Sequence, residues 1–153
     1  MKKFLFMLVA LLTMSTASFA QKGVTGFGVT GAYDDLFGQF GIGIKLQYGF
    51  VDQLRGDLGT EFYFKKDGMS LADVNGNLHF VVPVVDKFNV YPLAGLNIAF
   101  FNNNVPTRLG VNLGGGLEYF VTDQVKIGAE AKYIVSDNGF SRFNIGGGVT
   151  FIF

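Results

Sequence analysis

Hydrophobic and polar residues alternate along most of the chain after residue 20. The clearest stretch is QFGIGIKLQYGF, in which Phe40, Ile42, Ile44 and Leu46 alternate with glycines, Lys45 and Gln47. Successive side chains of a β-strand point to opposite faces, so this period of two predicts a strand and excludes a helix. The same alternation recurs at 58–64, 78–84, 96–100, 109–119, 125–135 and 143–153. With a weaker strand near 23–33, the pattern predicts eight strands.

The predicted strands are joined alternately by two kinds of connection. VDQL, VVDKF and VTDQV, centred on Asp52, Asp86 and Asp123, are near-copies that indicate a repeated hairpin turn. Asp suits such turns because its side chain can bond nearby backbone donors. The other connections are longer and polar: DDLFGQ, KKDGMS, NNNVPT and SDNG, near 34–38, 66–72, 101–107 and 136–141. This alternation is typical of an up-and-down sheet with two chemically different ends.

The bulky apolar face of these strands indicates which side of the sheet points inward. An eight-stranded barrel has an interior barely wide enough for modest side chains, so the row from Phe40 to Phe50 would overfill it. Glycines and small polar residues fit that interior better. The apolar face then points outward, into lipid, where a closed barrel keeps every backbone group paired. The predicted fold is all-β: an eight-stranded antiparallel up-and-down transmembrane β-barrel.

The first twenty residues, MKKFLFMLVALLTMSTASFA, have the three parts of a secretory signal peptide. Two lysines precede an apolar run, and the segment ends in the small-residue stretch Ser18-Phe19-Ala20. The apolar run is shorter than the roughly 20 residues of a membrane-spanning helix. We therefore expect a cleaved signal peptide at 1–20 and a single barrel domain at 21–153.

Composition narrows the class of protein further. Without Lys2 and Lys3, the chain carries ten Lys and Arg against twelve Asp and Glu, a net charge of −2. That balance argues against a nucleic-acid partner, which requires a basic face. The absence of cysteine excludes disulfides and thiolate metal sites. Abundant glycine (22 residues) and scarce proline (3 residues) suit a strand-rich chain.

The stretches YPLAGLNIAF and GVNLGGGLEYFVTDQVKIGAEAKY, together with the ending GGGVTFIF, resemble the small outer-membrane barrels of Gram-negative bacteria. This is the OmpA/OmpX type, described as the outer membrane protein β-barrel domain, and the resemblance covers 21–153. It implies a location in the outer membrane and a sorting signal in the last strand, matched by Gly146, Gly148, Phe151 and Phe153. It also implies that periplasmic chaperones and the outer-membrane assembly machinery handle the chain. Because the sequence stops at Phe153, we expect no peptidoglycan-binding domain after the barrel.

The inward positions of the predicted strands carry charges that can pair inside a narrow lumen. We expect a lumen network of Lys45, Glu61, Glu118, Lys126, Glu130, Lys132 and Arg142. If equivalent three-residue turns lie at 52–54 and 123–125, the ladder places Lys45 opposite Glu61 and Glu118 opposite Glu130. A like-charge pair is unfavourable unless a cation intervenes, and the candidates to bridge the two glutamates are Lys132, Lys126 and, from the next strand, Arg142. On this register, Glu118→Gln leaves stability unchanged or improved, whereas Lys132→Met destabilises.

Two features suggest other chemistry, and each has a simpler interpretation. Gly26, Gly28 and Gly31 match the dinucleotide fingerprint GxGxxG, but that motif needs a helix starting at the glycines, and a turn follows instead. His79, the only histidine, lies mid-strand on an inward face, and the nearest serine lies in a predicted loop. We interpret it as a lumen side chain bonded to Asn or water, with Gly95 opposite. No catalytic, cofactor-binding or metal site is expected.

These observations predict a non-enzymatic outer-membrane barrel with a polar, ion-paired, side-chain-filled lumen. It would serve a structural or surface-interaction role in the Gram-negative envelope, as a monomer surrounded by outer-membrane lipid. Two alternatives stay open: an outer-membrane enzyme that modifies lipids, of acyltransferase or deacylase type, and a small passive pore. The loops carry no motif that identifies an external ligand.

Overall fold

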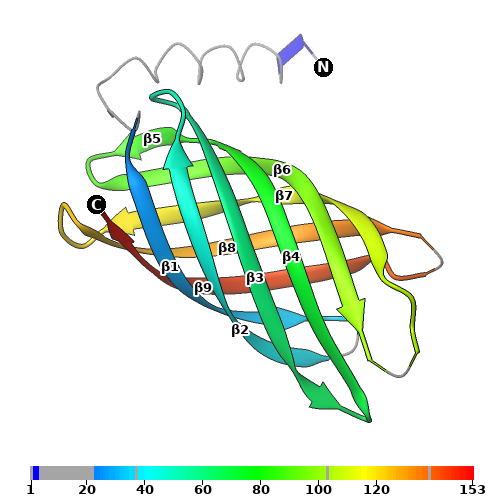
Figure 1. The fold of residues 1–153 in the computed structure, drawn as a ribbon. Helices are drawn as coiled ribbons and strands as arrows, with labels where there is room; N and C mark the ends of the chain where they lie inside the picture. Colours follow the sequence, from blue (N-terminus) through cyan, green and yellow to red (C-terminus); the bar gives the residue numbers. More distant parts are fainter. Residues whose placement is uncertain (1, 4–22, 37, 103, 138) are drawn as a thin grey trace.

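The chain forms a closed antiparallel barrel (Figure 1). The computed structural model describes residues 2–3, 23–36, 38–102, 104–137 and 139–153, so the expected signal peptide lies almost entirely outside the described residues. The strands are β1 (Thr25–Asp34), β2 (Gln39–Gly49), β3 (Leu54–Lys66), β4 (Met69–Phe80), β5 (Val82–Val85), β6 (Phe88–Phe101), β7 (Arg108–Phe120), β8 (Val125–Ser136) and β9 (Arg142–Ile152).

Strands β4 and β5 together occupy one position in the wall. They are separated at Val81, whose backbone N–H donates to the Gln53 carbonyl over 2.7 Å. Both pair with β6 in a common register, from Leu71↔Phe101 to Val82↔Val90. The barrel therefore has the eight antiparallel strands that the alternation predicted, which confirms the fold.

Closure comes from the pairing of the first strand with the last. Gly26 lies opposite Ile152, and β9 pairs on its other side with β8. Consecutive strands pair all the way round, so each wall strand has a neighbour on both sides. The chain end and the start of β1 lie at the same end of the barrel (Figure 1). Among the described residues, no helix is long and apolar enough to cross a membrane.

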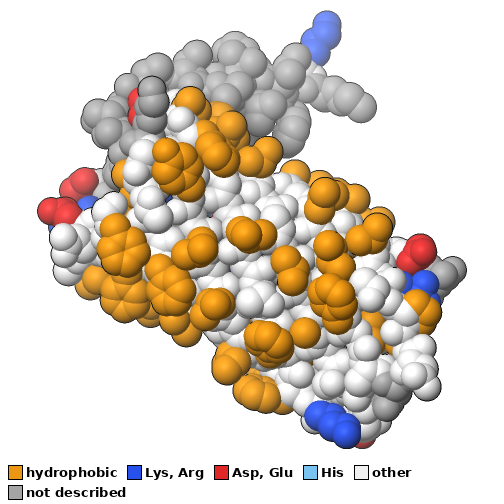
Figure 2. Space-filling view, viewed as in Figure 1, with side chains coloured by type: hydrophobic (Ala, Val, Ile, Leu, Met, Phe, Trp, Pro, Cys, Tyr) orange, Lys and Arg blue, Asp and Glu red, His pale blue; other side chains and the backbone are white. Residues whose placement is uncertain are grey.

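The side-chain alternation places apolar residues outside and polar residues inside. Along β2, the outward side chains of Phe40, Ile42 and Ile44 are 67%, 56% and 50% exposed, whereas inward Gln47 is 3% exposed. Figure 2 shows hydrophobic side chains over the wall and charged side chains at the two ends of the barrel. A soluble barrel would bury the apolar face, so this inversion fits a barrel whose outer solvent is lipid.

The two ends of the barrel differ, as the connections predicted, with one exception. The turn end holds the connections 50–53, 86–87 and 121–124, and the loop end holds 35–38, 67–68, 102–107 and 137–141. The predicted loop at 66–72 is wrong, because β3 and β4 continue to Lys66 and Met69, which pair directly. Asp67 and Gly68 both have positive φ, 52° and 81°. An Asp-Gly pair suits such a two-residue turn, and the hairpin extends as ordered strand.

Candidate functional site: the lumen

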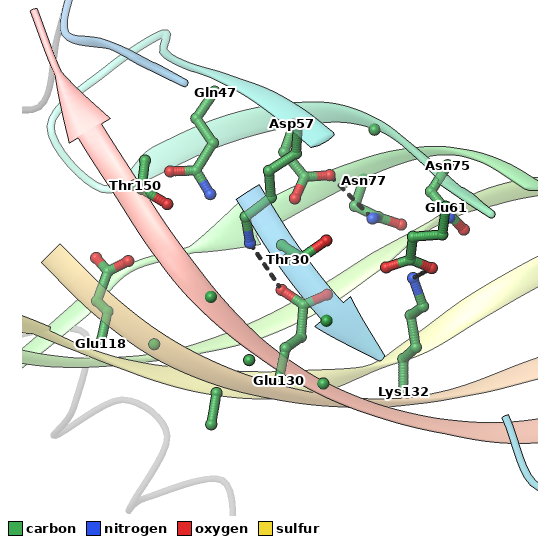
Figure 3. A pocket seen from close by; sticks show the side chains of 18 of the residues that line it. Thr30, Gln47, Asp57, Glu61, Asn75, Asn77, Glu118, Glu130, Lys132 and Thr150 are labelled. Carbon is green, nitrogen blue, oxygen red and sulfur yellow. Dashed lines mark hydrogen bonds and ion pairs between the residues drawn. The ribbon is translucent and has the colours of Figure 1, made fainter. Parts of the chain in front are cut away.

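The lumen is lined by polar side chains that project inward from the wall strands. Gln47, Asp57 and Glu61 come from β2 and β3, and they face Glu118, Glu130 and Lys132 from β7 and β8 (Figure 3). A polar cavity of about 50 Å³ lies among them. This volume has room for a few water molecules, since a cavity needs roughly 10–15 Å³ to hold one water.

Toward the turn end, Glu118 binds two buried cations. Its Oε1 accepts from Arg55 NH1 over 3.0 Å, and its Oε2 lies 2.9 Å from Lys126 Nζ. Asn89 also donates to Oε1, over 3.2 Å. The side chains of Glu118, Arg55 and Lys126 are each 3–4% exposed. Because this carboxylate is shared by two cations, its charge is fully compensated inside the barrel.

His79 lies beside this cluster and connects it to Asp57. Arg55 donates to His79 Nδ1 from Nε over 3.3 Å and from NH2 over 3.0 Å. His79 Nε2 lies 3.1 Å from Asp57 Oδ2, and its ring stacks on Tyr91 with centroids 4.4 Å apart. The expected partners, Asn or water, are therefore wrong: His79 contacts Arg55 and Asp57. The residue opposite His79 on β6 is Leu93 and not Gly95.

Asp57, His79 and Glu130 are close enough to be considered as a metal site, since their ligand atoms lie within 4.8 Å of one another. The hydrogen bonds of the histidine oppose this interpretation. A guanidinium is always a donor, so His79 Nδ1 must accept and the ring proton must sit on Nε2. Nε2 then has no lone pair for a metal, whereas metal-bound histidines usually donate their other nitrogen to an acceptor. The geometry favours a close His–Asp pair, with Nε2 and Oδ2 3.1 Å apart, over a metal site.

A row of amides continues the network through the middle of the barrel. Asn77 donates to Asp57 over 2.9 Å, and Asn112 donates to Asn77 over 2.8 Å and to Asn75 over 2.9 Å. Asn75 in turn donates to Asp73 over 3.0 Å. These three amides and two acids come from β3, β4 and β7, so the bonds connect β7 to β4 past the intervening strand β6.

At the loop end, Arg142 binds two carboxylates from different strands. Its Nε lies 2.6 Å from Asp34 Oδ2 on β1, and its NH2 lies 3.0 Å from Asp73 Oδ2 on β4. All three side chains are fully buried. An apolar cluster packs in the same part of the lumen and consists of Ala32, Tyr63, Leu71 and Ala99. Charge pairs and apolar packing together fill the loop end.

The remaining expected charges form two further pairs around the cavity. Lys45 Nζ lies 3.8 Å from Glu130, which also accepts from Tyr91 Oη over 2.9 Å. Lys132 Nζ lies 3.6 Å from Glu61. All seven expected charges thus lie in the lumen and take part in ion pairs, but with partners that the ladder did not predict.

The predicted register is wrong by two residues in both hairpins. Lys45 lies opposite Gly59, and Glu118 lies opposite Gly128. The three-residue turns are equivalent, as expected, but they occupy 51–53 and 122–124. Thr122 explains the position of the second turn, because its Oγ1 accepts from the backbone of Gln124 and Val125. As a result, Lys132 pairs with Glu61 and does not bridge Glu118 and Glu130.

Four charged residues of the lumen network were not predicted from the sequence: Arg55, Asp57, Asp34 and Asp73. A signal for three of them was present, because Arg55, Asp57 and Asp73 keep the inward parity of their predicted strands. Extending the alternation to the strand ends would have included them. Asp34 was assigned to a loop, although β1 continues to that residue.

The residues of the expected sorting signal lie on the closing strand. Gly146 and Gly148 face inward, and Phe151 and Phe153 face outward, 44% and 79% exposed. A Cβ added to Gly148 would collide with the Val29 carbonyl oxygen of β1, so this position requires glycine. The Phe153 N–H donates to the Thr25 carbonyl over 2.8 Å.

Comparison with known protein families identifies the family of this chain. Residues 6–153 match the model of the outer membrane protein β-barrel domain. The chain belongs to this family. It is therefore an outer-membrane transmembrane β-barrel of the Gram-negative envelope, as the resemblance to the OmpA/OmpX type implied. No curated protein sequence matches.

Solved members of the outer-membrane barrel class have the same fold at low identity. The N-terminal β-barrel domain of Pseudomonas aeruginosa OprF is 20% identical with a TM-score of 0.67, over 86% of this chain and 98% of that one. Neisserial surface protein A is 18% identical with a TM-score of 0.66, over 85% and 96%. Ail, the attachment invasion locus protein of Yersinia pestis, is 15% identical with a TM-score of 0.57, over 86% and 99%.

Proposed function

We propose that this protein is a non-enzymatic outer-membrane barrel with a structural or surface-interaction role. The observation that carries the proposal is the filling of the loop end by Arg142, its two aspartates and the apolar cluster around Tyr63. A lumen filled in this way stiffens the barrel and leaves the loop-end connections as the part that can meet external molecules. The signal peptide at 1–20, chaperone-assisted export and a monomeric state belong to the same proposal.

The positions of His79 and the serines argue against the lipid-modifying enzyme. A catalytic Ser–His pair needs the two side chains within hydrogen-bond reach. His79 is fully buried and lies nine residues along β4 from Ser70, about 30 Å at the rise of a strand. Ser136 and Ser141 also lie at the loop end and bond to each other. The Ser141 hydroxyl donates to the Ser136 carbonyl over 2.8 Å.

A surface role also finds support in the relatives. Ail is named for attachment and invasion, and it has been solved with the heparin analogue sucrose octasulfate. At the loop end of this protein, Lys65, Lys66 and Arg108 are balanced by acids that include Asp67 and Asp137. We therefore place polar recognition by the loops ahead of simple attraction of polyanions.

Three strains test the proposal: a deletion strain, the strain complemented with the full protein, and the strain complemented with a barrel whose connections 102–107 and 137–141 are shortened. A structural role predicts that both barrels restore resistance to detergent. A surface role predicts that binding to host or envelope ligands is lost with the loops. Mass spectrometry of lipid A that shows a covalent change dependent on the barrel would overturn the non-enzymatic assignment.

A further inference from the structure

The turn end of the barrel contains a second cavity, distinct from the lumen cavity, of about 290 Å³. We call it the vestibule. Its floor is formed by Gln47, Arg55 and Lys126, and its apolar wall by Val24, Phe120 and Ile152. The volume lies near the lower limit of pockets that hold small organic ligands, roughly 300 Å³.

The floor of the vestibule carries an excess of positive charge. Arg55 and Lys126 share the single carboxylate of Glu118, which lines the deeper lumen cavity and not the vestibule. The other lumen cations each have a carboxylate of their own: Lys45 has Glu130, Lys132 has Glu61, and Arg142 has two. Among the ion pairs of the described residues, cations therefore outnumber carboxylates at this floor.

Gln47 adds a polar side chain to the same floor. It is 3% exposed and lines both cavities. Its Oε1 is an acceptor without a partner among the described residues, so only its NH₂ group can meet an anion. Figure 3 shows Gln47 at the border of the lumen cavity, and the same side chain also lines the vestibule, where its NH₂ group can donate to an acceptor.

The rim of the vestibule limits the charge of a ligand. Asp86, Lys87 and Asp123 line the opening and are exposed. Two acids against one lysine disfavour the entry of a multiply charged anion, whereas a single negative charge can reach the cationic floor. The apolar wall requires a nonpolar body attached to that charge.

From this geometry we propose that the vestibule binds an amphipathic monoanion, a carboxylate with a short apolar chain. The carboxylate lies at the Lys126 ammonium, which has N–H groups beyond the one directed at Glu118, and it accepts from the Gln47 amide. The chain packs against Val24, Phe120 and Ile152. The site is independent of the proposed structural role, because it uses the turn end and leaves the filled loop end unchanged.

The test uses the folded protein in phosphatidylcholine nanodiscs, titrated with octanoate and followed by amide chemical shifts. The expected result is a saturable change at Gly26, Phe120 and Lys126. Octanol, which lacks the charge, and inorganic phosphate, which lacks the chain, should each bind at least about tenfold more weakly, as expected for the loss of one charge-assisted hydrogen bond or of the apolar contact.

Three variants complete the test. Val24→Trp fills the vestibule without touching a charge and should abolish saturable binding. Lys126→Gln should weaken octanoate binding about tenfold or more. Lys66→Gln removes a loop-end cation and should leave the affinity unchanged. Equal binding of octanol and octanoate, shifts confined to lipid-facing amides, or full binding by Val24→Trp would each overturn the proposal. If Lys126→Gln fails to fold, octanoate binding by Val24→Trp is sufficient to support or overturn the proposal.

Discussion

Arg55 and Glu118 are 63 residues apart in sequence, yet their side chains meet inside the barrel with NH1 and Oε1 3.0 Å apart. The first lies on β3 and the second on β7, so the pair crosses the lumen and does not belong to any one hairpin. Together with Arg142, which joins β1, β4 and β9, it ties opposite walls of the barrel to each other.

Replacing Glu118 tests the turn-end cluster. Glu118→Gln keeps the volume but leaves two buried cations without a carboxylate, so we expect a loss of about 3–5 kcal/mol in the free energy of unfolding. This reverses the outcome expected from the ladder register. Urea titration of the folded protein in lipid measures it. The control Asp137→Asn removes a 68% exposed partner of Arg108 and should change stability by at most about 1 kcal/mol. Equal effects of the two variants would contradict the cluster.

Arg142→Met tests the loop-end cluster. The substitution leaves Asp34 and Asp73 buried without their cation, so we expect a destabilisation of about 3–5 kcal/mol, measured in the same titration. Arg108→Met is the matched control, because Arg108 faces a solvent-exposed carboxylate 3.6 Å away. If Arg142→Met unfolds at the same urea concentration as the wild type, this ion pair does not hold the walls together.

Deleting Phe153 tests the sorting signal. Its N–H bonds the Thr25 carbonyl at the β1–β9 seam, and its ring projects outward at the chain end. We expect less heat-modifiable, folded protein in outer-membrane fractions. Phe64→Ala, which removes an equally outward ring on β3 (59% exposed), should assemble normally. Undiminished assembly of the deletion variant would show that the assembly machinery does not recognise Phe153.

The orientation of the barrel gives a further prediction. The short connections should be periplasmic and the loop end extracellular, since this class of barrel places short turns on the periplasmic side. Cysteine variants at Asp67 and Lys87, labelled on intact cells with an impermeant reagent, distinguish the ends. We expect label at position 67 and none at position 87. The reverse labelling pattern would show that the barrel has the opposite orientation in the membrane.

Strand alternation was enough to predict the fold and the inward side of each strand. Lys45, Glu61, Glu130 and Lys132 all lie in the lumen because parity alone decides the face. The pairing was not predictable in the same way. Moving a three-residue turn by one position shifts the opposite residue by two. For this reason the predicted partner of Glu118 is Glu130, whereas the residue opposite it in the structure is Gly128.

Contacts across the lumen are harder to predict from the sequence than strand register. Arg55 and His79 sit on adjacent strands, opposite each other in register, and an accurate register would have paired them. Arg55 with Glu118 and Arg142 with Asp73 join strands that are not neighbours. Such pairs depend on the tilt and stagger of the whole barrel, which no single hairpin reveals.

Ion conductance tests the central claim, the filled lumen, most directly. The folded wild-type protein is inserted into planar bilayers, and its folded fraction is verified by the gel shift on heating. We predict no stepwise currents at moderate voltage, because Arg142 and its two aspartates are fully buried at the loop end, where the apolar cluster also packs. Reproducible single-channel steps that scale with the amount of folded protein would contradict the account and favour the passive pore.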